Sequence, residues 1–140
     1  AGGQLWIATA PLVFACCARL DWDIARQPED DFGLIVNRLR FDHAFLDYLC
    51  QYPDGKARMT LFENATPLIP AEHIFLTAVS HGLSACFIGC LDIPKADKIL
   101  NLPANITCLY LLPVGYPDET PKTKQRKDLS EIIFFDQWKR

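Results

Sequence analysis

The sequence predicts an α+β domain, a layered arrangement in which helices pack on a sheet that is buried on both faces. Two observations predict this class. Residues 12–18 are apolar throughout and residues 106–114 are apolar on both faces, as is typical of strands buried on both faces. Between them, longer segments carry apolar residues at helical spacing.

Composition and charge exclude several classes of protein. The 140 residues have a hydrophobic fraction of 50% and a mean hydropathy of +0.06, which suits one globular domain rather than a disordered chain. The longest apolar run, residues 8–18, is well short of the roughly 20 residues that cross a bilayer. The 14 Lys and Arg against 17 Asp and Glu offer no basic footprint for nucleic acid. We therefore expect neither a membrane nor nucleic acid as a partner.

The six cysteines are expected to be reduced thiols. Most of them lie within apolar runs, where free cysteine packs as a small hydrophobic residue. No C-x2-C pair occurs, and the three histidines do not complete a zinc pattern. This usage predicts a cytoplasmic protein without a metal site. The cysteines in apolar runs are Cys16, Cys17, Cys86 and Cys108.

In the N-terminal half, a first buried strand is expected over residues 12–18, followed by a helix over residues 30–51. Acidic residues 29–31 stand at the helix N-terminus, where the helix dipole favours negative charge. A turn signal at residues 52–55 ends the helix. Residues 56–66 fit a lid, a loop or an irregular strand. The apolar stripe of the helix comprises Phe32, Ile35, Val36, Leu39, Leu46, Leu49 and Cys50.

The clearest helix is predicted over residues 66–82. Pro67 suits its first turn, and Gly82 suits the position just after its end. A second, shorter helix is predicted over residues 94–100, with Asp92 as its N-cap.

Short strands are predicted over residues 85–88 and 106–114. The tail changes character, since residues 118–128 are charged and contain proline, which favours an extended chain. The apolar run of residues 132–135 then needs a surface on which to be buried.

Several motifs stand in a recurring order. AEHIFLTAVSHGLSACFIGCLD, ILNLP and YLLPVGYPDE follow one another, with IATAPLVFACCA upstream and PKTKQRKDLSEIIFF downstream. This order resembles the FMN-dependent nitroreductase family, in which a helix ends in G-L, a strand in I-G, a helix in L-x-L-P and a strand in G-Y-P. A basic K-x-R segment and a C-terminal strand follow in that family. The likeness covers most of the chain apart from residues 20–64.

The resemblance implies a nitroreductase-like central sheet flanked by helices, and a homodimer in which the C-terminal strand crosses to the partner. It also implies an FMN-dependent oxidoreductase that uses NADH or NADPH to reduce nitroaromatic, quinone or related acceptors. The family's N-terminal, Arg-rich segment for the FMN phosphate has no counterpart here. We therefore expect residues 1–140 to be a single domain that lacks its N-terminal part. His73 replaces the family's usual Asn, a change the sequence does not explain.

Two groups of candidate cofactor-binding residues emerge, and no catalytic side chain. Lys124 and Arg126 are two apart, so on an extended chain both point the same way and could hold a phosphate. The resemblance implies the FMN phosphate, whereas a solvated basic tail is the alternative. By the same resemblance, the backbone of Phe87, Ile88 and Gly89 lies against the flavin ring. A glycine at a strand end permits such close approach, although it also occurs at ordinary strand-to-loop junctions.

Two further hypotheses stay open. The chain could be a non-catalytic member of the same fold that binds flavin or another ligand. It could also be a small α/β interaction module. Bound flavin and oxidation of a reduced nicotinamide separate these alternatives from the enzyme.

Overall fold

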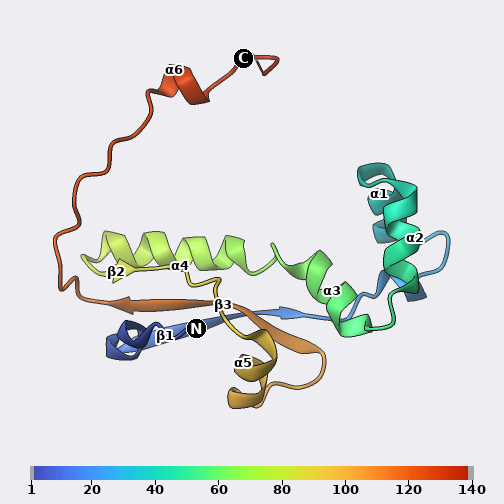
Figure 1. The fold of residues 1–140 in the computed structure, drawn as a ribbon, viewed down its shortest axis with the longest axis horizontal. Helices are drawn as coiled ribbons and strands as arrows, with labels where there is room; N and C mark the ends of the chain where they lie inside the picture. The colour runs from blue at the N-terminus through green and yellow to red at the C-terminus, as the bar shows by residue number, and fades with distance from the viewer. Residues whose placement is uncertain (1, 139–140) are drawn as a thin grey trace.

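The structure is a computed structural model that describes residues 2–138, so residues 1, 139 and 140 of the predicted domain lie outside it. A three-stranded antiparallel sheet with the order β1-β3-β2 lies between α4 on one side and α5 on the other (Figure 1). The elements are η1 (Leu5–Thr9), β1 (Leu12–Arg19), η2 (Ile24–Arg26), α1 (Phe32–Arg40), α2 (His43–Gln51), α3 (Gly55–Glu63), α4 (Leu68–Ser80), β2 (Ser84–Ala85), α5 (Ile93–Ile99), β3 (Ile106–Gly115) and α6 (Leu129–Ile132).

The central strand β3 is buried along most of its length, as its sequence predicts. Leu112 and Cys108 are fully buried in it. The expectation for β1 is wrong in its first half, because Leu12 is 49% and Val13 38% exposed. β1 is an edge strand of the described sheet, with β3 as its one neighbouring strand.

The main apolar core forms between α4 and the sheet. Ala71 and Ala78 are small, which lets the helix approach Leu112 and Val114 of β3 closely. Beside this cluster, the rings of Phe75 and Phe87 stack with centroids 5.6 Å apart. The predicted end of α4 is confirmed, since Gly82 adopts a φ of 73° just beyond the helix.

The helix predicted over residues 30–51 is two helices, α1 and α2. The apolar spacing continues across the break, but the Asp42 carboxylate accepts a hydrogen bond from the Phe45 N–H and starts a new helix. Residues 56–66, for which the sequence left several structures open, mostly form α3, which Asp54 caps in the same way.

Residues 22–63, which contain η2, α1, α2 and α3, are called the excursion below, and they have a small core of their own. Figure 1 shows α1 and α2 standing apart from the sheet. Ile24, Leu34 and Leu46 are buried together, and Trp22 packs against Phe62 edge to face, with ring centroids 5.6 Å apart.

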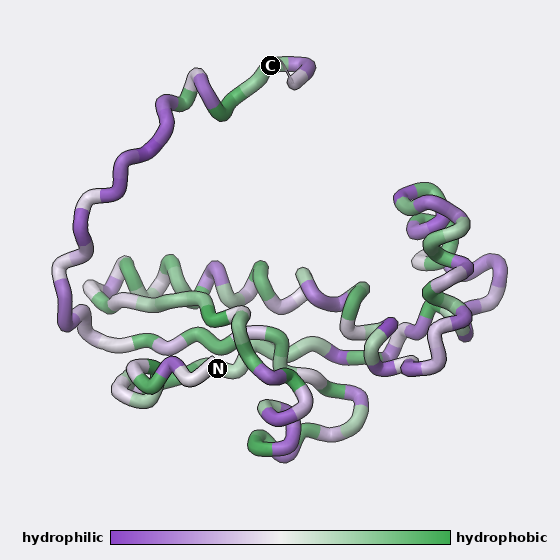
Figure 2. Tube along the Cα trace, in the orientation of Figure 1, coloured by the Kyte–Doolittle hydropathy of each residue, from purple (hydrophilic) through white to green (hydrophobic). Residues whose placement is uncertain are grey.

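The tail leaves the sheet after β3 and runs away from it (Figure 1). Figure 2 shows hydrophilic residues along its extended part and hydrophobic ones around α6. The C-terminal strand expected over residues 132–135 was to cross to a partner and stays a prediction; within the described chain these residues pair with no strand. A strand needs a neighbouring edge, and the tail has none here, whereas Asp128 and Glu131 form a local capping box that starts α6.

Within the described part of the chain, no helix combines the length and the apolar character needed to cross a membrane.

Candidate cofactor site

The backbone of residues 87–89 presents two free hydrogen-bond donors. The Ile88 N–H donates to the Leu111 carbonyl at 2.9 Å, and the Leu111 N–H donates to the Ile88 carbonyl at 3.0 Å. Neighbouring residues of an antiparallel ladder point their polar groups the other way. Accordingly, the N–H groups of Phe87 and Gly89 find no acceptor among residues 2–138. Ile88 thus anchors the segment to β3, while the donors on either side of it face away from the sheet.

The side chains of this segment hold it in place. Ile88 is 3% exposed, and Phe87 is held by its stack on Phe75. A methyl group added at Gly89 would lie 3.5 Å from the Tyr110 ring, an ordinary contact. The described chain would therefore accept alanine at this position.

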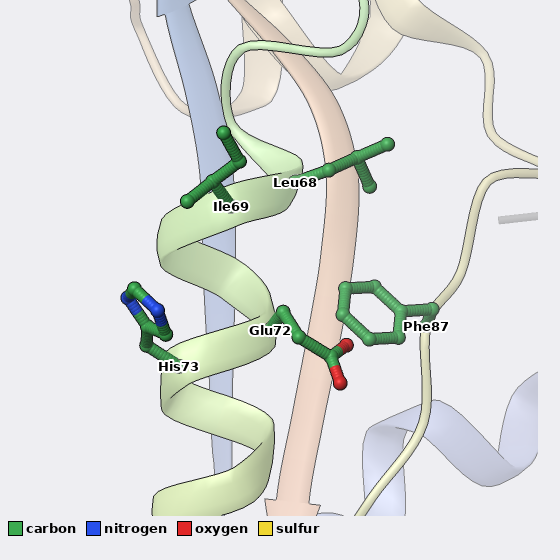
Figure 3. A pocket seen from close by; sticks show the side chains of 5 residues that line it. All are labelled: Leu68, Ile69, Glu72, His73 and Phe87. Atoms are coloured by element: carbon green, nitrogen blue, oxygen red, sulfur yellow. The ribbon is translucent and has the colours of Figure 1, made fainter.

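A groove lies beside Phe87, between the loop after β2 and the N-terminal half of α4 (Figure 3). It has a volume of about 390 Å³. Its walls are apolar except for one carboxylate and one imidazole. The residues that line it are Leu68, Ile69, Glu72, His73 and Phe87.

Lys124 and Arg126 lie on the exposed, extended part of the tail. The tail that carries them runs away from the sheet and from the segment that follows β2, so the two predicted parts of the cofactor site stay apart in this chain (Figure 1). The extended conformation agrees with the prediction for residues 118–128.

Sequence reasoning missed a buried ion pair in the excursion. The Arg58 guanidinium donates to the Asp23 carboxylate at 2.8 and 3.1 Å, and both side chains are less than a tenth exposed. Arg58 also donates to the Tyr52 carbonyl. The hydrogen bonds from Arg58 hold the pKa of Asp23 below its usual range. The partners are 35 residues apart, so no local pattern signals the pair.

A second buried carboxylate, Asp97 of α5, joins the excursion to the sheet. It accepts hydrogen bonds from the Lys56 ammonium of α3, the Thr107 hydroxyl and the Cys108 N–H of β3. Burial favours the neutral acid, but these donors outweigh it and hold the pKa of Asp97 below its usual range.

The six cysteines are free thiols in the structure. Burial raises the pKa of Cys108 to about 12, and it also raises the pKa values of Cys16 and Cys17. These three are therefore packing residues rather than nucleophiles. Cys86 and Cys90, on either side of the 87–89 segment, are exposed.

The order of α4, the segment of residues 87–89, α5 and β3 along the chain follows the order of the motifs described above. The sequence model of the Nitroreductase family matches residues 2–116. The chain therefore belongs to the Nitroreductase family, which confirms the resemblance and the predicted fold class.

The chain is also similar to individual members of this family. It is 31% identical over 91 residues to an NADPH-flavin oxidoreductase from Vibrio harveyi, a match that covers 61% of this chain and 38% of the relative. It also resembles the solved structure of NfrA2 from B. megaterium, with a TM-score of 0.63 and 23% identity over 99% of this chain and 50% of that one.

A third likeness is to nitroreductase A from Vibrio parahaemolyticus, with a TM-score of 0.51 and 28% identity over 59% of this chain and 36% of that one. The chain thus spans half or less of the length of these relatives.

Proposed function

We propose that the protein is an FMN-dependent oxidoreductase that takes electrons from NADH or NADPH and reduces nitroaromatic, quinone or related acceptors. Family membership and the named activity of the Vibrio harveyi relative support this. The observation that carries the proposal is the pair of free N–H donors at Phe87 and Gly89. In such an enzyme a bound flavin supplies the hydride-transfer chemistry, and the protein binds and orients the reactants.

The residues of the 87–89 segment fit a flavin. Flavin rings carry several nitrogen and oxygen acceptors along one edge, and two unpaired donors on the open edge of a strand end suit such an edge. Ile88 holds both donors in position through its paired hydrogen bonds to Leu111. The protein needs no side-chain acid or base to bind and orient a flavin in this way.

The phosphate would be held by Lys124 and Arg126. Arg offers a planar fork of donors and Lys a point charge, a pair that suits an anion with several oxygens. The tail leaves its own sheet, so we propose that it reaches the site of a second copy in a homodimer. The apolar end of the tail supports this, because Phe135 is 82% exposed and needs a surface. The free thiols agree with a cytoplasmic location.

Flavin binding is the first test. The purified chain is titrated with FMN, and uptake is followed by the visible spectrum and by quenching of flavin fluorescence. Arg126→Ala should weaken binding about tenfold, because a hydrogen bond to a charged group is lost. Lys122→Ala is the matched control, since it removes a charge from the same tail and should change binding little. A chain that stays colourless in excess FMN would contradict the proposal.

A non-catalytic, flavin-binding role is the alternative, and the distance of the tail from residues 87–89 favours it if the chain stays a monomer. Light scattering gives the oligomeric state. Oxidation of NADH or NADPH with added FMN and a quinone gives turnover. FMN uptake without turnover would favour the alternative.

A further inference from the structure

The groove beside Phe87 combines an apolar wall with a single nearby carboxylate. Leu68 and Ile69 supply aliphatic surface, and the Phe87 ring, backed by its stack on Phe75, supplies an aromatic one. A flat ring bound here would gain apolar and aromatic contact.

Glu72 is the charge that such a ring would meet. Figure 3 shows its carboxylate extending from α4 toward the Phe87 ring, whereas His73 extends toward the other side of the helix. The helix positions three and four residues away from Glu72 are all apolar: Leu68, Ile69, Phe75 and Leu76. Among residues 2–138, Glu72 has no ion-pair partner. Its negative charge is therefore not neutralised within the described chain.

We propose that this groove binds the aromatic ring of the electron acceptor, and that Glu72 makes it select uncharged or cationic acceptors over anionic ones. The proposal rests on the function proposed above, because it places the acceptor beside the segment assigned to the flavin. The physical basis is that the exposed Glu72 carboxylate, beside an apolar wall, repels an anionic substituent and attracts a cationic one, with water screening part of the interaction.

The test uses three ligands that share one ring and differ in charge: para-nitrobenzamide, para-nitrobenzoate and para-nitrobenzylamine. Each is titrated into the isotope-labelled chain near neutral pH, and the amide signals of His73, Phe87 and Gly89 are followed by NMR. The neutral and cationic ligands should shift these signals at lower concentration than the anion does.

Glu72→Gln removes the charge with little change of shape. It should tighten binding of para-nitrobenzoate about threefold to tenfold and leave para-nitrobenzamide nearly unchanged, as expected for one partly screened charge. Asp47→Asn is the control, because it removes an exposed negative charge from α2, far along the chain. It should alter neither affinity.

Equal binding of anion and amide by the wild-type chain would overturn the proposal. So would an effect of Asp47→Asn as large as that of Glu72→Gln, or shifts confined to residues outside the groove. These titrations need no flavin. A chain that takes up no FMN but discriminates by charge would therefore contradict the proposed function alone, whereas an FMN-binding chain without discrimination would contradict this inference alone.

Discussion

The sheet with α4 and the excursion from η2 to α3 are stabilised in different ways. Between α4 and β3, the contact is apolar, with Ala71 and Ala78 packed on Leu112. In the excursion, three buried aliphatic residues form a small core, and the buried ion pair of Asp23 and Arg58 joins its first and last elements.

The difference follows from how much apolar surface each region can bury. A helix lying along a sheet removes a continuous stripe of apolar surface from water, and this burial alone contributes a large favourable free energy to folding. In the excursion, α1 and α2 stand apart from the sheet and bury less apolar surface, so the arrangement of its helices depends more on directed hydrogen bonds. Charged pairs of this kind specify geometry, but they become costly when one partner is lost.

The largest expected effect comes from Arg58→Ala. It leaves the Asp23 carboxylate buried without its partner, so the free energy of unfolding should fall by about 3–5 kcal/mol, as measured by urea denaturation. Arg26→Ala is the control, because Arg26 is 82% exposed and approaches Asp23 only at 3.6 Å. Its loss should be about 1 kcal/mol or less. Similar losses for the two variants would show that the excursion does not depend on the buried pair.

Acid should lower the free energy of unfolding through Asp23 and Asp97, by a smaller amount than Arg58→Ala does. Asp23 and Asp97 have folded-state pKa values below their usual range. Such groups bind protons more readily in the unfolded chain, so their stabilisation is complete above the ordinary pKa of about 4 and is lost as the pH falls through the folded value. The free energy of unfolding should therefore decrease below about pH 4.

Asp97→Asn separates the contribution of Asp97 to this acid sensitivity from that of Asp23. The variant removes one of the two titrating groups, so the slope of stability against pH should become shallower, although the stability at neutral pH also falls. Denaturation curves at several acidic pH values provide the measurement. An unchanged slope would mean that Asp97 does not contribute to the acid sensitivity.

The smallest effect concerns the thiols and tests burial in the sheet directly. Iodoacetamide should label the exposed Cys86 and Cys90 first, because Cys108 is buried and its pKa is about 12. Mass spectrometry of peptides from the native chain, with urea-unfolded chain as the control, gives the order. Labelling of Cys108 as fast as Cys86 would show that β3 opens readily.

Much of the fold could be predicted from local signals. The Asp92 cap and the Gly82 terminus depend only on residues within one turn, and both are confirmed. The break at Asp42 was missed because the apolar spacing runs through it, from Leu39 to Leu46, and hides a cap that is equally local. For the candidate site, the sequence singled out residues 87–89, whose role stays a prediction, and their free donors follow only from the pairing of Ile88 with Leu111. The roles of Lys124 and Arg126 stay predictions.

The sequence by itself determined where most helices and strands form, because caps, glycines and apolar spacing act over a few residues. Only the tertiary structure decided the antiparallel pairing of β1 with β3, the exposed start of β1 and the buried partners of Asp23 and Asp97. Those features depend on contacts between residues far apart in the chain. Their free energy comes from burial and desolvation, which no short stretch of sequence contains.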